Sequence, residues 1–137
     1  MRCDRGSWIL ASALALACAM SGCGAVDARR EAARAVVTRF EQAVREGDAA
    51  SLCGALAPGP REELELSRQA SCADSVLGED LPYGGAGRHV DVHGRQARVV
   101  LEKDTVFLSQ FPDGWKVVAA GCRPQGDRPY QCSMKGS

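Results

Sequence analysis

The first regular pattern in the chain is helical and covers residues 27–46. Asp27 is expected to cap the start of this helix, and Gly47 is expected to end it. Charged residues fall outside the apolar face, and Glu41 and Arg45 have the spacing of a favourable ion pair on the exposed side. Apolar residues recur at steps of three and four along one face: Ala33, Val36, Val37, Phe40, Ala43 and Val44.

Two shorter helices are predicted next. Asp48 is expected to cap a helix that runs through Leu56, and the Pro-Gly-Pro sequence at 58–60 breaks it. Pro60 can open a third helix through about Ala70, with Leu64 and Leu66 as its apolar residues. The glycine-rich stretch 81–87 then reads as a loop.

From His89 onward the pattern changes to alternation, which predicts strands. Val90 and Val92 share one face of a strand over 89–93. The segments 97–101, 105–111 and 115–121 continue the pattern, separated by turns at 94–95, 103–104 and 112–114. The tail at 129–132 is expected to add at most a short edge strand, where proline is tolerated.

Helices followed by strands indicate the α+β class. We expect one domain over residues 27–137, in which N-terminal helices pack on a curved four-stranded antiparallel sheet and give it a cone shape.

Residues 1–22 differ in composition from the rest of the chain. Arg2 and Arg5 precede an uncharged run over 8–20, which is too short for a membrane-spanning helix and has the pattern of a secretory signal. A buried N-terminal helix is the alternative, but such a helix should carry a polar face, and this run has almost none.

The signal ends in Met20-Ser21-Gly22-Cys23, which resembles the lipobox of bacterial lipoproteins. The resemblance implies cleavage before Cys23 and acylation of its thiol, with residues 23–26 as a short tether. The protein would then be lipid-anchored in the cell membrane and face outside the cytoplasm, because more than one acyl chain gives stable anchoring. Ordinary cleavage at a small-residue site is the alternative.

Seven cysteines make an odd count. Cys3 and Cys18 would leave with the signal and Cys23 would carry lipid, which leaves Cys53, Cys72, Cys122 and Cys132. An exported domain with an even set is expected to form disulfides, and four cysteines allow three pairings. We favour Cys53–Cys72 and Cys122–Cys132, because each then closes within one structural unit. A metal site is disfavoured, because there is no Cys-x-x-Cys pair and the histidines lie far away in sequence.

Charge excludes one class of partner. The chain has 17 basic and 17 acidic residues, and this balance argues against nucleic-acid binding, which needs a basic patch. No motif for a cofactor stands out.

The order of helices and strands resembles the nuclear-transport-factor-2-like (cystatin-like) superfamily, in which a long N-terminal helix lies across a curved sheet. The stretches 104–111, 114–124 and 129–132, with cysteines at 53, 72, 122 and 132, resemble the ending of small uncharacterised lipoproteins of GC-rich Gram-positive bacteria. These resemblances imply the cone-shaped fold and the lipid anchor. They bring no activity with them.

Candidate functional residues are few. His89 and His93 lie on one strand face with Asp91, but about 13 Å apart, too far for one metal ion. Acid–base residues inside a cone would come from Tyr83, Asp91, Glu102 and Asp104, and all four are expected to be solvated beside turns or on an outer face. Trp115 is expected to pack near Phe40 rather than to anchor a partner.

The sequence therefore predicts a non-enzymatic, lipid-anchored module that binds a protein or a small ligand through the cone mouth or the uncovered sheet face. The alternative is an isomerase- or hydratase-like enzyme that works inside the cone on a small molecule, and fold analogy gives it little weight. Homodimerisation through the open sheet face is a third arrangement.

Overall fold

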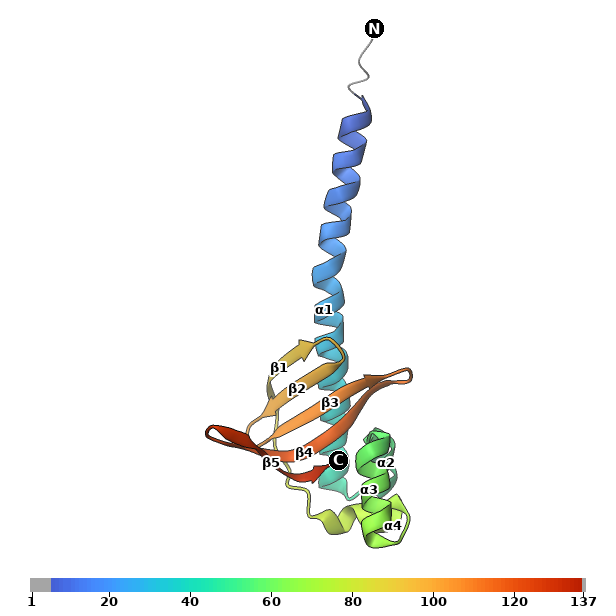
Figure 1. Ribbon diagram of the computed structural model, residues 1–137, viewed down its shortest axis with the longest axis vertical. Helices are drawn as coiled ribbons and strands as arrows, with labels where there is room; N and C mark the ends of the chain where they lie inside the picture. The colour runs from blue at the N-terminus through green and yellow to red at the C-terminus, as the bar shows by residue number, and fades with distance from the viewer. Residues whose placement is uncertain (1–5, 137) are drawn as a thin grey trace.

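The structure is a computed structural model that describes the backbone of residues 6–136 and the side chains of residues 24–136. Figure 1 shows one long helix, α1, running behind an antiparallel sheet, with the short helices α2–α4 packed beside its C-terminal end. The helices precede the strands in the chain, so the α+β class is confirmed.

Helix α1 spans Gly6–Glu46 without interruption. It includes residues 24–26, which the sequence assigned to a tether. Asp27 lies inside the helix rather than at its N-cap, and its carboxylate accepts a hydrogen bond from Arg30 at 3.1 Å. The side chains of Cys18 and Cys23 lie outside the described residues. Over the part that is described, no helix is long and apolar enough to cross a membrane.

The sheet has five antiparallel strands in the order β1-β2-β3-β4-β5. They are β1 Gly87–His93, β2 Gln96–Leu101, β3 Thr105–Phe111, β4 Gly114–Gln125 and β5 Arg128–Lys135. Two expectations were wrong: the sheet has five strands rather than four, and it is not closed or strongly curled, so it does not form a cone.

The fifth strand exists because β4 continues to Gln125, past Gly121, where the predicted strand ends. Gly121 adopts a positive φ of 63°, and Pro124 lies in a register shift between Arg123 and Gln125. A bulge of this kind tolerates a proline that cannot donate a ladder hydrogen bond. The extended β4 then gives β5 a full partner.

The short helices lie close to where the sequence places them. Helix α2 spans Ala49–Ala55, and Asp48 caps it as predicted, accepting a hydrogen bond from the Ser51 amide at 3.0 Å. Helix α3 (Pro58–Arg68) begins two residues earlier than expected, and it is followed by α4 (Cys72–Ser75) and the 3₁₀ helix η1 (Val76–Glu79). Leu64 is buried, but Leu66 is 78% exposed and does not contribute to the core.

The core lies between one face of α1 and one face of the sheet. Val37 and Phe40 of α1 are buried against an inner sheet face that includes Val99, Val106 and Leu108. Trp115 is buried in the same core cluster as Phe40, which confirms the expectation that it is a packing residue. Burying each such side chain contributes roughly 1.5–3 kcal/mol to folding.

Both predicted disulfides are present. Cys53–Cys72 connects α2 to α4, and Cys122–Cys132 connects directly paired residues of β4 and β5. Each closes a loop in the unfolded chain and is expected to stabilise the fold by about 2–4 kcal/mol.

Candidate functional site

A cavity of about 510 Å³ lies between α1, the loop before β1 and the inner face of β2. This volume is in the range of small-molecule sites in proteins. Its apolar lining includes the buried side chains of Val37, Val99 and Leu101. We call it the α1 cavity.

Glu41 is the most unusual residue of the α1 cavity. It was expected on the exposed side of α1, paired with Arg45, but it is only 4% exposed. Its carboxylate accepts a hydrogen bond from the Gly84 amide at 2.7 Å. Burial raises the pKa of Glu41 from 4.5 to about 7; repulsion from Asp104 adds to the rise, while the Gly84 and Gly85 amides oppose it.

Asp104 is the second buried carboxyl in this region. It was expected to be solvated in a turn, but it is 6% exposed, and neither of its oxygens has a hydrogen-bond partner. Burial raises its pKa, and the positive charge of Arg123 opposes the rise. A Cβ atom at Gly84 would lie 2.1 Å from Asp104 Oδ1, so only glycine fits between the two carboxyls.

Arginines on α1 line the α1 cavity on both sides of Glu41. Arg34 Nη1 donates to the carbonyl of Gly87 at 3.3 Å, while Arg34 Nε is buried with no hydrogen-bond acceptor. Arg45 stacks over the ring of Tyr83 at 5.1 Å. Tyr83 therefore lines the α1 cavity. It is 40% exposed, which confirms the expectation that its side chain is solvated.

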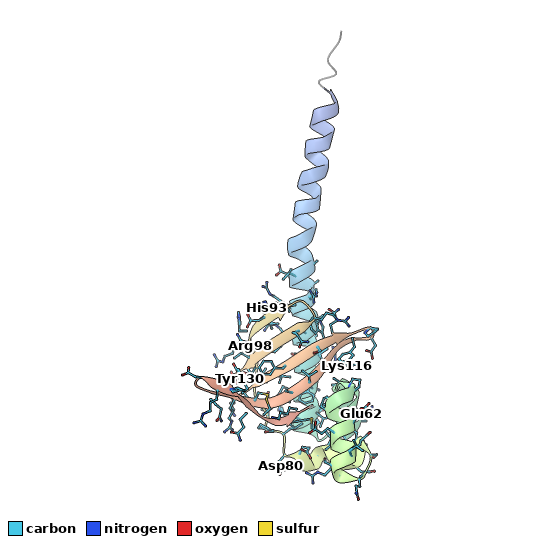
Figure 2. The ribbon with its side chains drawn as sticks, viewed as in Figure 1. Glu62, Asp80, His93, Arg98, Lys116 and Tyr130 are labelled. Carbon is cyan, nitrogen blue, oxygen red and sulfur yellow. A yellow bond between two sulfur atoms is a disulfide. The ribbon has the colours of Figure 1, made fainter. Side chains whose placement is uncertain are left out.

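The remaining candidates do not line the α1 cavity, although Glu102 lies against Gly85, which does. Asp91 accepts hydrogen bonds from Arg98 at 2.5 Å and is 2.7 Å from His89 Nε2. The hydrogen bond from Arg98 lowers the pKa of Asp91 the most, and the contact with His89 lowers it further. Glu102 pairs with Arg88 at 3.4 Å on the surface. Figure 2 shows His93 on β1, Arg98 on β2 and Tyr130 on β5.

The structure brings no metal site together among the residues that it describes, where no three potential ligands converge. His89 is bound to Asp91, and His93 is exposed at the far end of β1. The cysteines that could have been ligands are in disulfides.

A second hollow of about 750 Å³ lies between α1, α2 and the β3–β4 turn. Several of its polar groups already have partners: Asp48 caps α2, and Lys116 contacts both Asp113 at 3.3 Å and the Gly54 carbonyl at 3.0 Å. None of its described side-chain polar atoms is buried without a hydrogen-bond partner, whereas Arg34 Nε at the α1 cavity is.

Sequence reasoning missed Glu41, although a signal for it was present. Val37, Phe40, Glu41 and Val44 stand at positions i, i+3, i+4 and i+7, so Glu41 occupies a place within the apolar stripe. Its spacing to Arg45 suggested a surface pair instead. Tyr83 is the one predicted acid–base candidate that lines the α1 cavity.

No protein-family model, curated protein or solved structure matches this chain. Its function has to be inferred from its own residues.

Proposed function

We propose that this chain is a lipid-anchored, extracytoplasmic protein that binds a small molecule in the α1 cavity. The observation that carries the binding proposal is the cavity itself, with an apolar floor and a few convergent polar groups, which is the usual make-up of a ligand site. The anchor proposal is carried by the lipobox-like sequence at 20–23 and by two disulfides typical of exported proteins.

The anchor is tested by Cys23→Ala, with Cys18→Ala as the matched control from the same segment. We expect Cys23→Ala to move the protein out of the membrane fraction and Cys18→Ala to leave it there. Membrane retention of the Cys23→Ala protein would refute the lipid anchor.

Ligand binding is tested by filling the α1 cavity. A Cβ at Gly87 would meet only ordinary contacts, 3.6 Å from Arg34 Nη1 and 3.8 Å from Val99 Cγ1, so Gly87→Phe directs a ring into the cavity. Gly78 has open space around it and supplies the control Gly78→Phe.

The full chain, purified from membranes in mild detergent, is examined by native mass spectrometry. We expect a bound small molecule in the wild type and in Gly78→Phe, and none in Gly87→Phe. Equal occupancy in all three proteins would exclude the α1 cavity as the binding site.

Glu41 supports a second candidate, an enzyme that uses acid–base chemistry on a small molecule. A general acid or base works best when its pKa is near the working pH, and the pKa of Glu41 is raised to about 7 at the edge of an apolar cavity. Glu41 would then give a proton to the bound molecule or take one from it.

The enzyme candidate is tested by incubating the protein with a metabolite extract and comparing the compounds before and after. Turnover by the wild type that is lost in Glu41→Gln would support it. Glutamine keeps the acceptor for the Gly84 amide but cannot transfer a proton. An unchanged extract, or equal turnover by both proteins, would refute it.

A further inference from the structure

The polar groups of the α1 cavity are unbalanced between hydrogen-bond donors and acceptors. Its two carboxylates each have a donor: Glu41 accepts from the Gly84 amide at 2.7 Å, and Glu46 accepts from Gln42 at 2.9 Å. A ligand therefore does not need to bring a cation or a strong donor for them.

The guanidinium groups have more donors than partners: Arg34 Nη1 donates to the Gly87 carbonyl at 3.3 Å, and Arg34 forms an ion pair with Glu31. Arg34 Nε is buried, and its nearest carboxylate, Glu31, is 3.9 Å away, beyond hydrogen-bond reach. Among residues 24–136, no carboxylate lies within ion-pair distance of Arg45, whose guanidinium rests on Tyr83. Leaving a buried donor without an acceptor is costly, and a ligand that supplies an acceptor removes that cost.

The two arginines also share one face of α1. They are eleven residues apart, which is close to three full helical turns and about 16 Å along the axis. The apolar side chains of Val37, Val99 and Leu101 lie on the cavity wall with them. The cavity thus offers positive groups together with an apolar surface.

We propose that the α1 cavity binds an organic anion with an apolar tail, and that Arg34 receives the anionic group. This inference rests on the proposed ligand-binding function and specifies its ligand class. Charge-assisted hydrogen bonds from a guanidinium to an anionic oxygen are roughly twice as strong as neutral ones. Arg45 contributes less than Arg34, because it is more exposed to solvent.

The test uses three soluble probes with the same tail and different heads: octanoate, octanol and octylammonium. The full chain is reconstituted in lipid nanodiscs, and binding is measured by isothermal titration with empty nanodiscs as background. We expect octanoate to bind about tenfold more tightly than octanol, and octylammonium to bind most weakly.

Arg34→Gln then separates the charge from the shape of the cavity. We expect it to lower the affinity for octanoate about tenfold, to the level of octanol, while the affinity for octanol stays unchanged. Retained octanol binding shows that the cavity is still formed. Arg39→Gln is the matched control, because Arg39 is exposed on the same helix and does not line the α1 cavity, and it should change neither affinity.

The outcomes distinguish this inference from the proposed function. If all three probes bind equally, or octylammonium binds best, and Gly87→Phe abolishes binding, the cavity binds ligands but the anion assignment is wrong. If no probe binds above background, the ligand class is refuted, and native mass spectrometry of Gly87→Phe decides the ligand-binding function separately. If the probes bind and Gly87→Phe changes nothing, the α1 cavity is not the site and both proposals are refuted.

Discussion

The two faces of the sheet treat similar residues in opposite ways. On the outer face Asp91 is held by Arg98 and His89, and its pKa is lowered. On the side covered by α1, Glu41 of the helix itself is buried, and its pKa is raised to about 7. The difference comes from solvent: the open face lets charges pair in water, whereas the covered face removes water from a carboxyl that has only amide donors.

Aromatic residues offer the strongest test of this comparison. Phe40 of α1 is 1% exposed in the core between the helix and the sheet, whereas Phe107 is partly exposed on the outer face and packs edge-on against Tyr130 at 5.0 Å. We expect Phe40→Ala to lower the free energy of unfolding by about 4 kcal/mol and Phe107→Ala by about 1 kcal/mol. Urea denaturation of the full chain measures both. Equal losses would show that the outer face is covered as well.

The carboxyls of Glu41 and Asp91 should make stability depend on pH in opposite directions. For Glu41 the folded protein binds the proton more tightly than the unfolded chain, so stability is full below pH 4.5 and falls as the pH rises through about 7. The shift corresponds to about 3 kcal/mol. Asp104, whose pKa is also raised, acts in the same direction.

Urea unfolding between about pH 5 and pH 8 measures this fall, and Glu41→Gln should remove most of it. Asp91→Asn is the comparison from the outer face. The lowered pKa of Asp91 gives stability that is present above pH 3.8 and lost as the pH drops below it, so this variant should keep the fall between pH 5 and 8. A fall unchanged by Glu41→Gln would contradict the burial of its charge.

A substitution at Gly84 measures how closely the residues between α1 and the sheet are packed. Gly84→Ala would place its Cβ 2.1 Å from Asp104 Oδ1 and 2.6 Å from Leu101 Cδ1, and we expect a loss of about 2 kcal/mol in the free energy of unfolding. Gly54→Ala in α2, with open space around it, should leave stability unchanged or raise it by up to about 1 kcal/mol. Thermal unfolding of both variants measures these two changes. An unchanged stability of Gly84→Ala would mean that the loop moves to accommodate the added methyl group.

The smallest effect is expected for the ion pair on the outer face. Arg98→Met should cost less than about 1 kcal/mol, because exposed ion pairs contribute little to stability. Its stability should also depend less on salt than that of the wild type. A loss of several kcal/mol would indicate that Asp91 is less well solvated than its surroundings suggest.

The sequence by itself indicated most of the helices and strands, and it favoured the pairing of cysteines that the structure has. Alternation and helical periodicity report which side of an element is apolar, and turn residues mark where elements end. The N-cap of α2 at Asp48, the buried position of Trp115 and the local disulfides followed from such short-range chemistry.

Only the tertiary structure decided which polar residues are buried and how far the sheet extends. Glu41 and Asp104 are buried because the loop at Gly84 closes over them, and this loop is distant in sequence from both residues. β5 and the C-terminal half of β4 form because they pair with each other. This pairing holds Gly121 and Pro124 of β4 in the strand, although both are poor strand formers on their own. Solvent access and pairing are properties of neighbours in space, so periodicity along the chain could not supply them.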